Sequence, residues 1–146
     1  MKNPRCELGL LMAGAIACAG CTDGVPVVLE SRRFASPDLK HEATVEAVDN
    51  ALGFGLGAIY DEVHVWVPGA TFQHGDSDST AVFYAESAYP EGVGPTVRWL
   101  NPHRLVIQYP EKNPPGRMKS EMLGISITYE AVPLEAYAAA QSASEP

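Results

Sequence analysis

From residue 25 onward the chain alternates apolar and polar residues over short stretches, which are separated by turns rich in proline and glycine. A period of two is typical of half-buried β-strands, because successive side chains point to opposite faces of a sheet. The expected strands span 25–31, 42–49, 59–67, 80–87, 96–100, 104–109 and 124–131. About seven strands with no long helical pattern between them predict an all-β fold, an antiparallel meander or sandwich.

Strand parity also predicts the core. The clearest strand pair is a hairpin around Asn101-Pro102-His103, whose inward side is apolar, as is that of the last strand. The expected inward residues are Val97, Trp99, Leu105, Ile107, Tyr109, Ile125, Ile127 and Tyr129. Because alternate residues share one face, these side chains should meet in a single interior.

The start of the chain follows a different pattern. After the basic residues Lys2 and Arg5, the stretch Leu8–Ala19 is apolar and uncharged. It has the length of the apolar region of a secretory signal and is too short to cross a bilayer as a permanent helix, and we expect it to be helical and detached from the core. A lipid-attachment cysteine is expected at its end.

Two cysteines compete for the lipid. Cys18 follows Ala15-Ile16-Ala17, which resembles a bacterial lipobox, whereas Cys21 follows Cys18-Ala19-Gly20. We favour Cys18, with Cys21 as the alternative. Plain secretion, with cleavage after an A-x-A sequence and no lipid, is the simpler interpretation.

These patterns divide the chain into a signal peptide (1–17), a lipidated cysteine with its tether (18–24), a β-domain (25–132) and a short helix with a frayed tail (133–146). Pro133 suits the first turn of that helix. Without Lys2, Arg5 and Glu7, 8 basic and 17 acidic residues remain, a net charge of about −9. So acidic a chain is a poor candidate for binding nucleic acid or anionic lipid headgroups, because phosphate binding requires clustered Lys and Arg.

All three cysteines lie at or before residue 21, so the β-domain has none for disulfides, thiolate catalysis or cysteine–zinc sites. We expect no cofactor. His74, Asp76 and Asp78 are weak candidates for a metal site, because they lack the spacing of calcium loops and of zinc ligands. A solvated acidic loop is the simpler interpretation.

One strand offers a candidate binding surface. Tyr60, His64 and Trp66 share the face opposite Val63 and Val65, and we expect this face to be exposed to solvent. Such a patch suits a glycan, a peptide or an envelope protein. The alternative is that a second sheet or the C-terminal helix covers it.

A family resemblance enters through the order SPD-x-x-x-x-A-T-V, a V-x-V strand, V-R-W-L-N-P-x-x-L-x-I-x-Y and a final G-I-x-I-x-Y, over Ser36–Tyr129. This order resembles small uncharacterised bacterial lipoproteins, which typically carry SPDG where this chain has Leu39. The resemblance implies a β-domain on a lipid anchor in the bacterial envelope and no particular activity.

The sequence therefore predicts an exported protein, held to a membrane by its N-terminal lipid, that acts as a non-enzymatic binding or structural module. The alternative is an envelope enzyme or enzyme inhibitor with a site in loops 50–58 and 68–79. No serine lies in a G-x-S-x-G motif, and no spacing pairs a nucleophile with a base.

Overall fold

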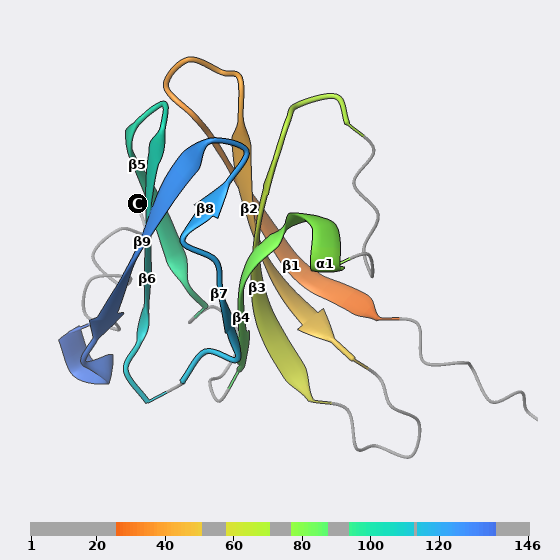
Figure 1. The fold of residues 1–146 in the computed structure, drawn as a ribbon. Coiled ribbons are helices and arrows are strands. Elements are labelled where there is room, and N and C mark those ends of the chain that lie inside the picture. Colours follow the sequence, from red (N-terminus) through yellow and green to blue (C-terminus); the bar gives the residue numbers. More distant parts are fainter. Residues whose placement is uncertain (1–25, 51–57, 71–76, 88–93, 113, 137–146) are drawn as a thin grey trace, which may run out of the picture.

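The structure is a computed structural model that describes residues 26–50, 58–70, 77–87, 94–112 and 114–136. The described residues form two sheets, the short helix α1 and a helical turn at 134–136 (Figure 1). One sheet has the order β1-β2-β3-β4-β7 and the other β5-β6-β9-β8. The elements are β1 (Val27–Ala35), β2 (Glu42–Asp49), β3 (Ile59–Trp66), α1 (Ser77–Thr80), β4 (Ala81–Glu86), β5 (Thr96–Asn101), β6 (Arg104–Pro110), β7 (Arg117–Met118), β8 (Glu121–Met122) and β9 (Ile125–Val132).

The all-β prediction is confirmed, but the expectation of a purely antiparallel fold is wrong at one place. β6 and β9 are parallel, with Leu105 opposite Ile127. The reason lies in the segment between them, which contains two short strands that the sequence pattern did not reveal. β7 pairs with β4 in the other sheet and β8 follows it, so the chain re-enters as β9 in the direction of β6 (Figure 1).

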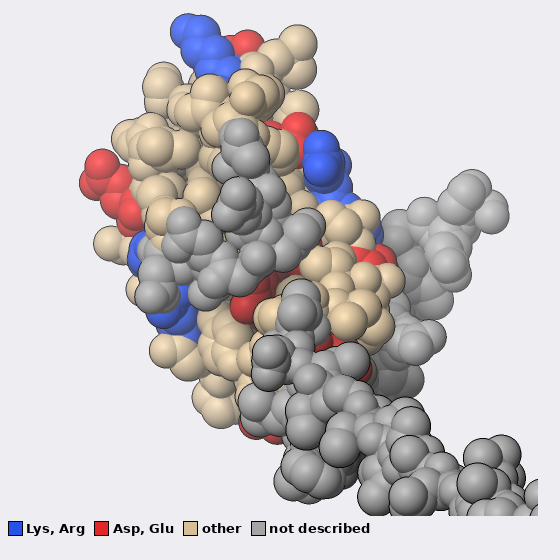
Figure 2. Space-filling view, turned by 90° about the vertical axis from the view of Figure 1, so that its right-hand side faces the viewer, with Lys and Arg blue, Asp and Glu red and all other residues tan. Residues whose placement is uncertain are grey.

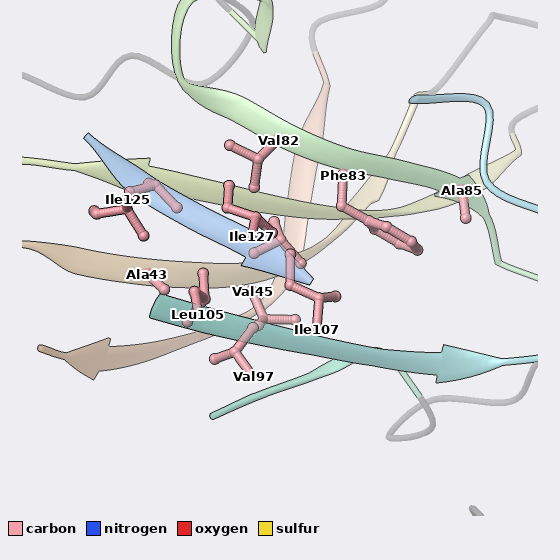
Figure 3. Packing of buried hydrophobic residues seen from close by; sticks show 12 residues of the cluster. Ala43, Val45, Val82, Phe83, Ala85, Val97, Leu105, Ile107, Ile125 and Ile127 are labelled. Atoms are coloured by element: carbon pink, nitrogen blue, oxygen red, sulfur yellow. The ribbon is translucent and has the colours of Figure 1, made fainter. Parts of the chain in front are cut away.

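The two sheets share one hydrophobic core, to which both contribute buried side chains (Figure 3). The predicted hairpin is present as β5 and β6, with Val97 opposite Ile107. The inward set is confirmed: Val97, Leu105, Ile107, Ile125 and Ile127 are buried, and Trp99, Tyr109 and Tyr129 are partly buried against them. Strand parity is therefore sufficient to identify this half of the core.

The turn between β1 and β2 is held by side chains. The Ser36 hydroxyl donates to Asp38 at 2.8 Å and accepts from the His41 amide at 3.0 Å. The bond from Ser36 is the main reason that the pKa of Asp38 is lowered. Leu39 in this turn has a φ of 60°, a left-handed conformation that glycine adopts without steric cost.

The end of the described chain turns helical at 134–136, in agreement with the predicted short helix. Within the ranges given above, no helix is long and apolar enough to cross a membrane. The expected signal helix Leu8–Ala19, with Cys18 and Cys21, lies outside the described residues.

Candidate functional site

Two polar clusters stand out in the described part of the chain. The first lies on the face of the five-stranded sheet that points away from the core; we name it the outer-face cluster. It brings together side chains from β1, β2, β3 and the end of α1. Its members are Ser31, Arg33, Thr44, Glu46, Glu62, His64, Trp66 and Thr80.

The prediction that His64 and Trp66 are exposed is wrong. The exposed fraction is 2% for His64 and 9% for Trp66, and their strand neighbours Thr44 and Glu46 are at 2%. Parity placed these side chains on the correct face, but that face is covered rather than open to solvent. Burial of the outer face depends on contacts from distant parts of the chain, such as the contact of Thr80 with His64. The alternation of residues along one strand contains no information about such contacts.

The indole of Trp66 is fixed by two contacts. Its Nε1 donates to Thr44 Oγ1 at 2.9 Å, and the guanidinium of Arg33 lies 5.3 Å from the ring centroid. A buried indole N–H requires an acceptor, and a cation over the ring face is attracted by its quadrupole. Both contacts position Trp66 as a structural residue.

His64 connects a hydroxyl to a carboxylate. Its Nε2 lies 2.9 Å from Glu62 Oε2, and its Nδ1 lies 3.1 Å from Thr80 Oγ1. A carboxylate only accepts, so the imidazole N–H is at Nε2 in the neutral ring. Nδ1 then accepts the Thr80 hydroxyl proton, which gives the order hydroxyl, imidazole, carboxylate.

That order is the connectivity of a nucleophile with its general base and orienting acid. A working site also requires space for a substrate beside the hydroxyl, and the His64 side chain is only 2% exposed. The described residues therefore present a closed hydrogen-bonded chain rather than an open active site.

The carboxylates of this cluster are also partnered. Glu46 and Glu62 lie directly opposite each other on β2 and β3, an arrangement that is unfavourable for like charges. Ser31 donates to Glu46 at 3.1 Å, and His64 donates to Glu62. Among the residues that the structure describes, no group of three or more His, Cys, Asp and Glu side chains is placed to hold a metal ion. Figure 2 views the molecule from the right-hand side of Figure 1 and shows acidic side chains near the middle of that face.

Tyr60, the third residue of the predicted patch, is half-buried. Its ring stacks on Tyr84 of β4 with centroids 4.7 Å apart. Burial, and then the hydrogen bond to Tyr60, raise the pKa of Tyr84 above its ordinary value. The three predicted residues thus lie along β3, but they do not form an exposed patch.

The second cluster, which we name the inter-sheet clasp, consists of Arg32, Asp61, Ser87 and Pro95. Arg32 of β1 donates from Nη2 to the Pro95 carbonyl at 3.2 Å, at the entrance to β5 in the other sheet. Asp61 of β3 has an exposed fraction of 6%, and a Cβ placed on Gly94 would lie 3.1 Å from its Oδ1. The clasp therefore holds the start of the second sheet against the first.

Burial is the main cause that raises the pKa of Asp61 from 3.8 to about 6, and the Ser87 hydroxyl and Arg32 oppose the rise. Asp61 was not predicted as a site residue, although the sequence contains a signal for it. Asp61 shares its parity with Val63 and Val65, so a carboxylate stands at an inward position. An ionisable group on the core side of a strand is uncommon and requires partners.

The remaining candidates fall elsewhere. His74 and Asp76 lie outside the described residues, as do residues 51–57 of loop 50–58 and residues 71–76 of loop 68–79. Asp78 belongs to α1, and nothing is described of its side chain.

No family model, no curated protein and no solved structure matches the chain.

Proposed function

We propose that this protein is an exported, lipid-anchored component of the bacterial envelope that acts as a non-enzymatic binding or structural module. The observation that carries the proposal is the uncharged apolar stretch Leu8–Ala19, with Cys18 and Cys21 near its end, a few residues before the first strand at Val27. A short apolar region after a basic start directs export, and a cysteine at its end is the residue that accepts a lipid.

The described polar clusters support a binding or structural role. In the outer-face cluster, Trp66 and His64 are buried, and their ring nitrogens hydrogen-bond within the domain. Such fully bonded networks stabilise one arrangement of a fold. The loops between the strands are then the parts of the module that remain for contact with a partner, an envelope protein or glycan.

Metabolic labelling with palmitate tests the anchor. Full-length protein should carry the label and sediment with membranes, and Cys18→Ser should abolish both. Cys6→Ser is the matched control, because Cys6 lies before the apolar stretch and should leave labelling unchanged. Label that survives Cys18→Ser but disappears in Cys21→Ser moves the site to Cys21; an unlabelled parent protein would refute lipidation.

A second candidate, an envelope hydrolase, rests on the chain of Thr80, His64 and Glu62. In that case Thr80 Oγ1 is the nucleophile, and opening of the covering residues would admit the substrate. A fluorophosphonate probe should then label full-length protein, and both Thr80→Val and His64→Asn should lose the label. Equal labelling of parent and variants, or none at all, would exclude this role for Thr80.

A further inference from the structure

Three exposed leucines lie at one end of the molecule, which we name the leucine end: Leu39, Leu100 and Leu123. Their exposed fractions are 72%, 45% and 51%. Leu39 is in the turn between β1 and β2, Leu100 is next to the turn between β5 and β6, and Leu123 is in the turn between β8 and β9. These turns lie together at the top of Figure 1.

One hydrogen bond between the sheets and one within the second sheet show that these turns belong to the same end. The indole of Trp99, one residue before Leu100, donates from Nε1 to the Phe34 carbonyl of β1 at 2.9 Å. In the second sheet the amide of Ser126, three residues after Leu123, donates to the His103 carbonyl at 2.9 Å. The three leucines therefore project from neighbouring turns.

The fold itself does not require leucine at two of these positions. Leu39 and Leu123 have φ values of 60° and 53°, and they are the residues other than glycine with positive φ in the described part of the chain. A side chain in this conformation is strained, whereas glycine is not. Leu39 is 72% exposed and Leu123 is 51% exposed, so neither side chain is fixed by burial in the core.

We propose that the leucine end inserts into the interface of a lipid bilayer. A fluid bilayer can accommodate leucines on separate turns whatever the distance between them. A protein partner would need pockets at the same spacing as the leucines. Two exposed basic residues lie beside these leucines: Lys40, whose Nζ is 3.9 Å from Asp38 Oδ2, and Arg104 at the start of β6. Asp38 and Glu121 balance these two positive charges, so burial of the apolar leucine side chains, rather than charge, would drive the insertion.

This inference rests on the proposed function, since the anchor supplies the bilayer. From Cys18 to Val27 an extended chain reaches about 30 Å. β1 has nine residues and runs from Val27 towards the leucine end, a length of about 30 Å. The tether is thus long enough for the leucine end to reach the membrane that holds the lipid.

Tryptophan fluorescence tests the insertion. Full-length lipidated protein carrying Leu39→Trp or Leu123→Trp is reconstituted into phosphatidylethanolamine–phosphatidylglycerol vesicles, with and without brominated acyl chains. After subtraction of the parent spectrum, which contains Trp66 and Trp99, the added emission should shift to the blue and be largely quenched by bromine. Glu111→Trp is the control: Glu111 is exposed at the opposite end, after β6, and its tryptophan should be neither shifted nor quenched.

Each other outcome overturns the inference in a distinct way. Protein that sediments with vesicles but shows no quenching at Leu39→Trp or Leu123→Trp refutes insertion and leaves the anchor intact. A blue shift without bromine quenching means that a protein surface, such as a second copy of this chain, covers the leucine end instead. Protein that does not sediment with vesicles refutes both the anchor and the insertion.

Discussion

Substitution of Asp61 by asparagine should stabilise the protein at neutral pH. Asp61 has an exposed fraction of 6%, and its pKa is raised from 3.8 to about 6, chiefly by burial. Between pH 3.8 and about pH 6, Asp61 is therefore protonated in the folded state and ionised in the unfolded state. Stability falls as pH rises through this window, because folding then requires a buried carboxylate.

The size of the effect follows from the shift. A rise in pKa from 3.8 to about 6 corresponds to about 3 kcal/mol at a pH above both values. Asparagine keeps the oxygen that accepts from Ser87 but carries no charge to desolvate. Asp61→Asn should thus match the parent near pH 4 and exceed its free energy of unfolding by up to about 3 kcal/mol at pH 7.

Urea denaturation of parent and variant across this pH range measures the difference directly. Other groups titrate as well, so the difference between the two proteins is the informative quantity. Glu111→Gln is the control, because Glu111 is exposed and its removal should give no pH-dependent difference. A difference between Asp61→Asn and the parent that stays constant with pH, or that grows towards acid, would refute the reasoning.

Two further predictions concern turns and tryptophans. Leu39→Gly and Leu123→Gly should each raise the free energy of unfolding by about 1 kcal/mol in thermal denaturation, because glycine relieves the left-handed strain at a smaller entropic cost. Trp66→Ala should cost about 3–5 kcal/mol in chemical denaturation, as much as Trp99→Ala, because both indoles are packed and hydrogen-bonded. Thr128→Ala, on an exposed side of β9, should be nearly silent.

Clear outcomes would contradict these two predictions. Destabilisation by either glycine substitution would mean that the leucine side chain packs within the domain. A nearly silent Trp66→Ala, beside a costly Trp99→Ala, would mean that the outer face is open to solvent, as the sequence pattern suggested. The burial of Trp66 at 9% exposure argues for the opposite result.

The inward half of the fold could be predicted because strand parity is a local property. Ile125 and Ile127 alternate with the polar residues Ser126 and Thr128 on β9, and both isoleucines are buried in the shared core. Pairing is not local, so the parallel contact of β6 with β9 was missed, as were the two-residue strands β7 and β8. Strands that short contain no periodicity to detect.

The candidate site was predicted less well, for a related reason. Parity assigned His64 and Trp66 to the face away from the core, but whether that face is covered depends on residues far away in sequence. Thr80 reaches His64 from 16 positions along the chain, and Arg33 reaches Trp66 from another strand. Asp61 was visible in the sequence as a carboxylate at an inward position, but its partners Arg32 and Ser87 were not.

The central claim, export with a lipid anchor, is tested most directly by the mass of the N-terminal peptide of protein extracted from membranes. We expect a peptide that begins at Cys18 and carries the added mass of acyl chains. A peptide that begins at an acylated Cys21 would change the site and preserve the claim. A mature N-terminus with both cysteines unmodified, or a chain that retains residues 1–17, would contradict it.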